Sequence, residues 1–263
     1  MTQDLRDRIC IVVASNSDEV LNRNLLASPL VAAGVPVEVV RGAPSAAVAY
    51  NRGLDATAAP LVIFAHHDVY LPAGWEARLA RALAAVEARD PDWALIGPYG
   101  VRDGGGHVGH VWSTSLGRAL GEPPAEPQPV ASFDELLLVM RRDAGLRFDE
   151  ALPLWHLYGT DIVQAARAAG RGAYVADLAC VHNDGFHGRL GADFGAAYDF
   201  LRRKWAARLP VWSPIVRVDR FGLGLPAYRL RAWRSLERRR AMALDPGSDP
   251  RLFARRCGWE PAV

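Results

Sequence analysis

The sequence has few cysteines, no long apolar run and almost balanced charge. Three widely spaced cysteines, Cys10, Cys180 and Cys257, form no pairing pattern, which argues against a disulfide framework and favours a reducing compartment. No stretch approaches the roughly 20 apolar residues that span a bilayer, and the N-terminal apolar run is too short for a signal peptide. A formal net charge of +2 gives no case for nucleic-acid binding. We therefore expect a cytoplasmic protein, free or peripheral to a membrane, with no nucleic-acid partner.

The first hundred residues alternate apolar strands with amphipathic helices. The predicted elements are strands at 9–14, 37–40, 61–65 and 94–101 and helices at 17–34, 46–59 and 75–90. Ser45 is the predicted N-cap of the second helix, and Pro60 ends it. This alternation predicts an α/β fold with a mostly parallel sheet flanked by helices. Such sheets bind ligands beyond the carboxyl ends of their strands.

The rest of the chain is less regular. From about 101 to 131, glycine and proline predict turns, a short hairpin and a mobile loop. The elements predicted after this loop are a strand at 134–143, a helix at 161–170 with Thr160 as N-cap, one or two strands at 173–182, and helices from about 192. We expect an α/β domain over 1–205 and a helical C-terminal extension over 206–263, packed on or beside that domain.

The first candidate site is His66-His67-Asp68, at the end of the third predicted strand. A carboxylate flanked by imidazoles suits Mg²⁺ or Mn²⁺, and such a metal clamps a diphosphate and neutralises its charge as it leaves. Asp68 is the predicted metal ligand, and His66 points to the same side of an extended chain. The alternative is a strand-end turn in which Asp68 caps the next helix and the histidines pack.

Two more candidates come from distant parts of the sequence. Asp161 lies in the first turn of a predicted helix, where the helix dipole favours the ionised carboxylate, and an ionised carboxylate takes an acceptor's hydroxyl proton as general base. His182 ends the last predicted strand and is a second candidate ligand, with His187 as its competitor. The alternatives are an ordinary helix-start aspartate and a structural histidine.

Taken in order, these segments resemble the GT-A glycosyltransferases, in particular family 2-like members with a histidine-containing HxD metal motif. The resemblance runs from about residue 9 to 205, and AYNRGLDATAAPLVIFAHHDVYLPAGW (49–75) is its most specific part. It implies a GT-A fold and an inverting, hexosyltransferase-type transfer from a nucleotide-diphosphate sugar to an acceptor hydroxyl, with Mn²⁺ or Mg²⁺ as cofactor. The acceptor stays open between a glycan, a lipid-linked compound and a small molecule.

The resemblance also implies roles for individual residues. It gives Asp68, His182 and His66 as metal ligands, Asp161 as catalytic base, and Ala14, Ser15, Asn51, Arg52 and His67 as donor-binding residues. Asn51 in helix packing and Arg52 as a surface charge are the alternatives. The segment 41–45 has no acid where the family carries an aspartate that reads the nucleobase, so the donor base stays open.

Residues near the predicted base suggest an acceptor site. Trp155 and His156 offer an aromatic face for stacking on a sugar and an imidazole for its hydroxyls, although Trp155 equally suits a loop anchor. The basic segment YRLRAWRSLERRR (228–240) suits peripheral contact with an anionic membrane, but a solvated helix packed on the domain is the favoured interpretation. Two other functions remain: a non-catalytic GT-A-like domain that binds a nucleotide or glycan in an assembly, and a zinc metallohydrolase.

Overall fold

The structure is a computed structural model, and it describes residues 2–261. Its centre is a seven-stranded sheet with the order β2-β1-β3-β11-β5-β12-β9. These strands are β1 (Ile9–Ala14), β2 (Val37–Val40), β3 (Leu61–His66), β5 (Trp93–Gly97), β9 (Gln128–Pro129), β11 (Leu137–Arg141) and β12 (Gly172–Val175). β11 lies antiparallel between β3 and β5 and β9 is antiparallel at the edge, whereas the other five strands run parallel. The predicted mostly parallel sheet is confirmed, with one reversed strand inside it.

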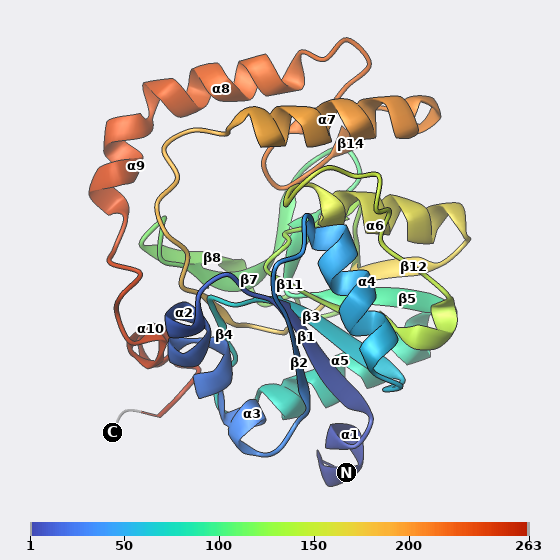
Figure 1. Cartoon of the computed structure of the whole chain (residues 1–263), viewed down its shortest axis with the longest axis vertical. Coiled ribbons are helices and arrows are strands. Elements are labelled where there is room, and N and C mark those ends of the chain that lie inside the picture. Colours follow the sequence, from blue (N-terminus) through green and yellow to red (C-terminus); the bar gives the residue numbers. More distant parts are fainter. Residues whose placement is uncertain (1, 262–263) are drawn as a thin grey trace.

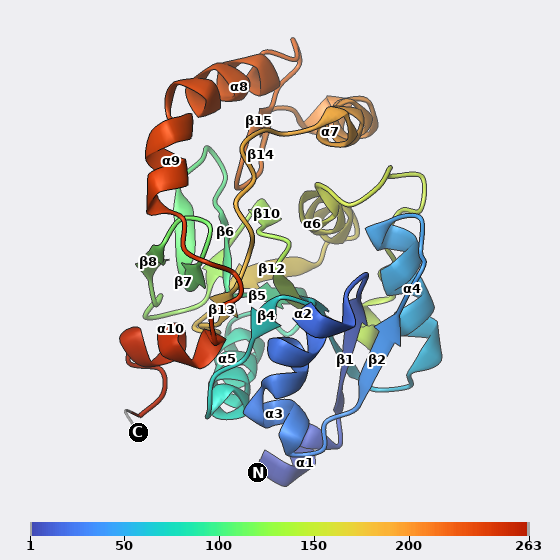
Figure 2. The same ribbon diagram turned by 60° about the vertical axis from the view of Figure 1, so that its left-hand side comes forward.

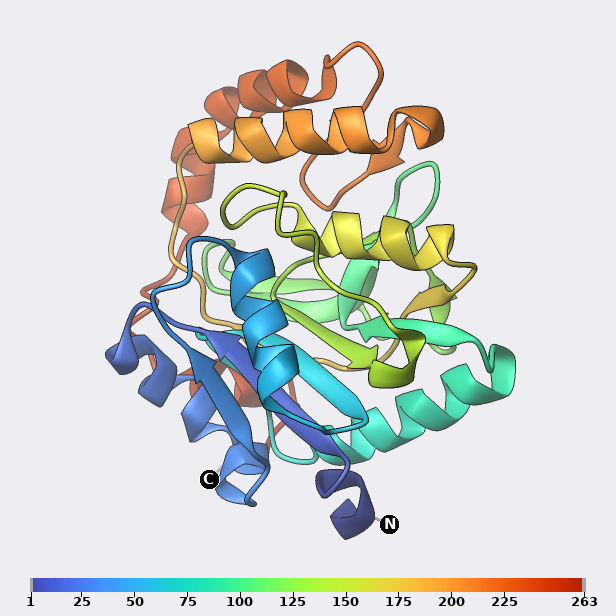
Figure 3. The same cartoon turned by 45° about the vertical axis from the view of Figure 1, so that its right-hand side comes forward.

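Helices cover both faces of this sheet because successive side chains of a strand point to opposite sides. The helices are α1 (Thr2–Arg6), α2 (Asp18–Arg23), α3 (Pro29–Ala32), α4 (Ala46–Ala56), α5 (Trp75–Arg89) and α6 (Tyr158–Ala168). Val12 and Phe64 pack with α4 and α6, while Val13 and Ile63 pack with α2, α3 and α5. Figures 1 and 3 show α4 and α5 on opposite sides of the sheet. The predicted α/β fold is therefore confirmed.

A second sheet lies beside the first. Its order is β10-β6-β7-β13-β4, and β8 pairs with β7. The strands are β4 (Val69–Tyr70), β6 (Tyr99–Val101), β7 (His107–Ser113), β8 (Arg118–Glu122), β10 (Ser132–Phe133) and β13 (Val181–His182). The single strand predicted at 94–101 is split by Pro98 into β5 and β6, which enter different sheets. The predicted run at 173–182 likewise becomes β12 and β13.

Two predicted helices differ from the observed ones. The helix predicted at 17–34 is broken into α2, a 3₁₀ turn at Leu25–Ala27 and α3, because Asn24 leaves the helical conformation and Pro29 starts a new helix. Helix α6 begins at Tyr158 rather than 161, so Thr160 lies buried inside its first turn and is not the N-cap. By contrast, the Ser45 hydroxyl accepts from the backbone N–H of Val48, as predicted for the N-cap of α4.

The C-terminal part lies partly beyond α6 and partly against the second sheet (Figures 1 and 2). Its elements are α7 (Ala192–Lys204), a 3₁₀ turn (Ala206–Arg208), β14 (Val211–Trp212), β15 (Arg217–Val218), α8 (Gly224–Arg234), α9 (Leu236–Met242) and α10 (Pro250–Arg256). Val218 and Leu225 belong to the same apolar cluster as α4 and α6. The predicted C-terminal helices are present together with a two-stranded sheet, while a division at residue 205 stays a prediction. Within residues 2–261, no helix combines the length and apolar character that crossing a membrane requires.

Candidate metal centre and pocket

The backbone brings His66, Asp68 and His182 together at one sheet edge. His66 is the last residue of β3, and Asp68 stands in the turn between β3 and β4. His182 ends β13, which pairs with β4 so that His182 lies opposite Val69. The backbone N–H of Asn183 also donates to the carbonyl of Asp68 at 2.9 Å. Convergence of residues 66, 68 and 182, which the sequence predicts, is therefore fixed by backbone pairing.

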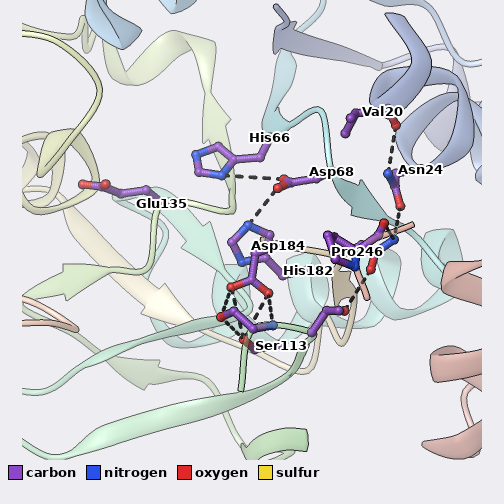
Figure 4. Close-up of polar contacts among 12 residues, drawn as sticks. Val20, Asn24, His66, Asp68, Ser113, Glu135, His182, Asp184 and Pro246 are labelled. Carbon is purple, nitrogen blue, oxygen red and sulfur yellow. Dashed lines mark hydrogen bonds and ion pairs between the residues drawn. The ribbon is translucent and has the colours of Figure 1, made fainter. Parts of the chain in front are cut away.

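The three side chains surround a small volume (Figure 4). Asp68 Oδ1 lies 3.4 Å from His182 Nε2 and 4.0 Å from His66 Nδ1, and the three ligand atoms lie within 4.8 Å of one another. Asp68 Oδ1 is buried and accepts no hydrogen bond from residues 2–261. A buried carboxylate oxygen without a donor is costly, and a cation between the imidazoles removes that cost. The residues thus fit a divalent metal ion.

Acidic groups dominate the electrostatics of this cluster. Burial lowers the pKa of His182, but the carboxylates of Asp68 and Asp184 outweigh burial and raise it to about 10. Burial raises the pKa of Asp68, yet the neighbouring imidazoles, His182 above all, bring it well below the usual range. Burial lowers the pKa of His66 to about 4, so this imidazole is neutral at physiological pH. Without a metal, His182 is therefore an imidazolium paired with Asp68, and a cation that binds at its Nε2 must displace that proton.

Tyr158 determines which ring nitrogen of His66 carries the proton. The Tyr158 hydroxyl donates to the backbone carbonyl of Glu135 at 2.6 Å, because a carbonyl only accepts. Its single proton is then used, so Tyr158 accepts from His66 Nε2 at 2.7 Å and from the Tyr50 hydroxyl at 3.3 Å. His66 therefore carries its proton on Nε2. Its Nδ1 keeps a lone pair that faces Asp68 and is ready for a metal.

An open pocket of about 450 Å³ lies against this cluster. Its lining residues are Ala14, Ser15, Asn16, Val40, Gly42, Ala43, Tyr50, His66, His67, Asp68, Glu135, Trp155 and His156. The Ser15 hydroxyl lies 3.1 Å from His67 Nδ1, which joins the end of β1 to the end of β3. Trp155 is 42% exposed, so much of its ring is free for contact. The residues predicted for donor and acceptor at positions 14, 15, 67, 155 and 156 thus line one pocket.

Asn51 and Arg52 do not line this pocket. The Asn51 amide donates to the carbonyl of Phe148 and to the carboxylate of Glu150, both at 2.9 Å. Its oxygen accepts from the backbone N–H of Phe148 at 3.0 Å. Both ends of the Asn51 amide hold the loop after β11 against α4, while the Arg52 side chain is exposed on the same helix. The packing interpretation of Asn51 and the surface interpretation of Arg52 fit this geometry better than donor contacts.

Asp161 is also absent from the pocket lining and is only 2% exposed. Its two oxygens accept from Lys204 Nζ and Trp205 Nε1, each at 2.8 Å, at the end of α7. Burial raises the pKa of Asp161, and the hydrogen bond from Lys204 opposes this shift. The predicted base therefore faces the end of α7 and does not line the pocket.

Two acidic residues that the sequence analysis does not single out stand near the cluster. Glu135 lines the pocket and accepts from the backbone N–H of Gly159 at 3.2 Å. Burial, with Asp134 beside it, raises the pKa of Glu135 well above its ordinary value. Asp184 accepts from the Ser113 hydroxyl at 3.1 Å and the Ser115 N–H at 3.0 Å. In the sequence, the signal for Glu135 is the acidic pair Asp134-Glu135 just before β11. Because β11 runs antiparallel to β3, its first residues lie at the sheet edge where β3 ends.

Comparisons with known proteins leave the family open. No family model matches. A curated protein of Fuscovulum blasticum, "ATP synthase subunits region ORF 6", is 30% identical over 162 residues, which are 58% of this chain and 61% of that protein. The match thus spans less than two thirds of that relative's length.

Solved structures with a similar course of the chain include two that were determined with a nucleotide and Mn²⁺. The mannosyltransferase PcManGT from Pyrobaculum calidifontis, in complex with GDP-Man and Mn²⁺, has a TM-score of 0.45 at 16% identity, covering 96% of this chain and 79% of its own. GalNAc-T7 with UDP, GalNAc and Mn²⁺ has a TM-score of 0.47 at 13% identity, covering 88% and 56%. A197 from STIV has a TM-score of 0.40 at 12% identity, covering 65% and 82%. Similarities of this strength carry no functional argument.

Proposed function

We propose that this chain is a metal-dependent glycosyltransferase that moves a sugar from a nucleotide-diphosphate donor to an acceptor hydroxyl. The observation that carries the proposal is the buried Asp68 oxygen, which has no donor among residues 2–261 and lies between two imidazoles. This oxygen belongs to a residue on the wall of an open pocket of about 450 Å³, a size that suits a small ligand. The reaction class comes from the sequence resemblance over 9–205.

The residues divide between donor and acceptor. Asp68, His66 and His182 would hold Mn²⁺ or Mg²⁺, which when bound supplies positive charge for the donor's diphosphate. Ser15 and His67, joined at the ends of β1 and β3, offer polar groups on the same wall. On the opposite segment, Trp155 offers an aromatic face for a sugar acceptor. His156 is oriented by Asp193 at 3.0 Å and offers its ring to acceptor hydroxyls.

Inversion by direct displacement requires a group that removes the acceptor's hydroxyl proton as the oxygen attacks. The sequence resemblance assigns this role to Asp161. The geometry favours Glu135, because its side chain lines the pocket whereas that of Asp161 does not. We therefore assign the base to Glu135 and keep Asp161 as the alternative that the same experiment tests.

The decisive experiment measures nucleoside-diphosphate binding by calorimetry, with and without Mn²⁺, followed by sugar transfer to a panel of acceptors. We expect Mn²⁺-dependent binding and transfer, and Asp68→Ala should weaken Mn²⁺ binding by about 100-fold or more, beyond the effect of an outer residue. Asp193→Ala is the matched control, because it removes a carboxylate of the acceptor side and should leave Mn²⁺ binding unchanged. Nucleotide binding that ignores Mn²⁺ would contradict the proposal.

A second function has one observation in its favour. Gly42 and Ala43 line the pocket where the family's nucleobase-reading acid is expected, and the segment 41–45 contains no acid. A non-catalytic domain that binds a nucleotide or glycan fits this departure. Binding without transfer or hydrolysis across all acceptors would favour this function. Zinc retained through purification, together with hydrolysis, would favour a metallohydrolase instead.

A further inference from the structure

Helix α8 is apolar on two faces, and only one of them is covered. On its inner face, Leu225 is 7% exposed and Tyr228 packs against the apolar cluster beneath α4 and α6. On its outer face, Leu223 is 62%, Leu230 48% and Trp233 66% exposed. Intervals of seven and three residues place these three side chains along one line of a helix. Leu223 also borders a cleft that Val101 and His107 line, but an apolar row this exposed still requires a partner to be buried.

This outer line extends to the start of the helix, where Phe221 is 81% exposed. We name the side chains of Phe221, Leu223, Leu230 and Trp233 the α8 stripe. In Figures 1 and 2, α8 and α9 form the outer rim of the molecule, and α7 lies between α8 and α6. With exposed fractions from 48% to 81%, the side chains of the α8 stripe are accessible to a large partner.

Unpaired arginines surround the α8 stripe. Residues 220–240 contain seven arginines and one glutamate. The exposed ones whose side chains make no hydrogen bond or ion pair with residues 2–261 are Arg220, Arg231, Arg234, Arg238 and Arg240. Arg239, in contrast, donates to the carbonyl of Gly188 at 3.2 Å and is partly buried. The positive charge around the stripe is thus not used to hold the fold together.

We propose that the α8 stripe docks on the surface of an anionic lipid membrane. Arginines near an anionic bilayer are attracted by its surface potential, while leucine, phenylalanine and tryptophan side chains enter the headgroup boundary. No described helix crosses a bilayer, so the contact is peripheral. This proposal rests on residues 220–240 alone and stands whether or not the chain transfers sugars.

Two other partners fit the stripe less well. A nucleic acid gains from the arginines, but its phosphate backbone leaves Leu223 and Leu230 without apolar contact. A second copy of the chain buries the leucines, but a two-fold interface brings the same arginine-rich patch against itself. The combination of exposed apolar groups and a single charge sign favours the membrane, and both other partners are outcomes of the test.

The test is flotation of the full chain with vesicles of phosphatidylglycerol and phosphatidylcholine, compared with vesicles of phosphatidylcholine alone. We expect binding to the anionic vesicles, and at least about tenfold weaker binding to neutral vesicles or at high salt. Equal binding to both vesicle types, or to neither, would overturn the proposal. Tight binding of a short RNA without vesicle binding would also overturn it. So would a dimer in gel filtration that Leu230→Ser/Trp233→Ser dissociates.

Three double variants distinguish binding through the α8 stripe from non-specific hydrophobic adsorption. Leu230→Ser/Trp233→Ser removes half of the stripe at exposed positions and should weaken vesicle binding by about tenfold or more. Leu244→Ser/Leu252→Ser removes two leucines that are 38% and 54% exposed elsewhere and should leave binding unchanged. Arg234→Glu/Arg238→Glu keeps the stripe and should also weaken binding by about tenfold. If the leucine control and the stripe variant lost vesicle binding equally, the assignment of binding to the α8 stripe would be wrong.

Discussion

Asp68, which has one buried oxygen, and the buried Asp161 are both carboxylates that the sequence marks as functional, yet their surroundings differ. One oxygen of Asp68 meets no donor among residues 2–261 and faces two imidazoles. Both oxygens of Asp161 are occupied, one by an ammonium and one by an indole N–H. A buried carboxylate with a free oxygen is prepared for a ligand, whereas one with two donors is already part of the structure.

The difference shows what the position of an acid in the sequence means. Asp68 follows a central strand at the carboxyl end of the sheet, where its side chain lines the pocket between the imidazoles of His66 and His182. Asp161 lies in the first turn of α6, where α7 packs over it and supplies Lys204 and Trp205. The same residue type thus stands beside a pocket at a sheet edge in one case and between two packed helices in the other.

The largest expected effect separates Glu135 from Asp161. Glu135→Gln keeps the shape of the side chain but removes the proton acceptor, so turnover should fall by about 10²–10⁴-fold. Asp161→Asn should leave turnover within a few-fold of the wild type, because residue 161 does not line the pocket. Steady-state kinetics at saturating donor measure both variants. Loss of turnover in Asp161→Asn alone, with the fold intact, would return the base to Asp161.

Removal of the Asp161 carboxylate should instead act on stability. Asp161→Ala leaves the Trp205 N–H without its buried acceptor and Lys204 with Asp149 alone, so the free energy of unfolding should fall by about 1–3 kcal/mol. Asp149→Ala is the matched control, because Asp149 meets the same ammonium at 2.7 Å but is 34% exposed. Its loss should cost less than about 1 kcal/mol. Urea denaturation measures both losses in the free energy of unfolding. Equal losses would show that the buried position of Asp161 adds nothing to its contribution.

The metal should stabilise the protein through Asp68 and not through Asp161. At a Mn²⁺ concentration of 100 times the dissociation constant, the free energy of unfolding should rise by about 2.7 kcal/mol. Asp68→Ala should abolish this rise, and Asp161→Ala should retain it on a lower baseline. Thermal unfolding with and without Mn²⁺ measures the effect. A rise that survives in Asp68→Ala would place the metal elsewhere.

Local signals explain which parts of the fold are predictable. The apolar run of β1 and the serine cap of α4 depend on neighbouring residues, and both are found as predicted. The helix expected at 17–34 fails at Asn24, whose amide donates to the carbonyl of Val20 and whose backbone leaves the helix. Helical periodicity continues across this residue, so the pattern alone does not reveal the break.

The site shows the same limit over longer distances. His66, Asp68 and His182 are found together because strand ends meet at one sheet edge, which an alternation of strands and helices already implies. Glu135 is missed because the direction of β11 is not recorded in its apolar pattern. Asp161 is paired with Lys204, 43 residues further along the chain, and no local signal announces that contact.

The smallest expected effect tests whether Tyr158 keeps the Nδ1 of His66 unprotonated toward Asp68. Tyr158 accepts from His66 Nε2, which leaves Nδ1 unprotonated toward Asp68. Tyr158→Phe removes that acceptor and lets the proton move to Nδ1, so Mn²⁺ affinity should fall by about tenfold. Calorimetric Mn²⁺ titration measures the loss, and nitrogen NMR of the metal-free protein reports which ring nitrogen carries the proton.

Tyr50→Phe is the matched control for this last test. Tyr50 is equally buried and loses only its 3.3 Å hydrogen bond to Tyr158, without contact to His66. Mn²⁺ affinity and the proton position should therefore stay as in the wild type. If both variants lose affinity equally, general loosening of the aromatic layer explains the effect. If only Tyr158→Phe loses affinity and the proton moves to Nδ1, Tyr158 prepares His66 as a metal ligand. The metal site then includes a residue that orients a ligand without touching the metal.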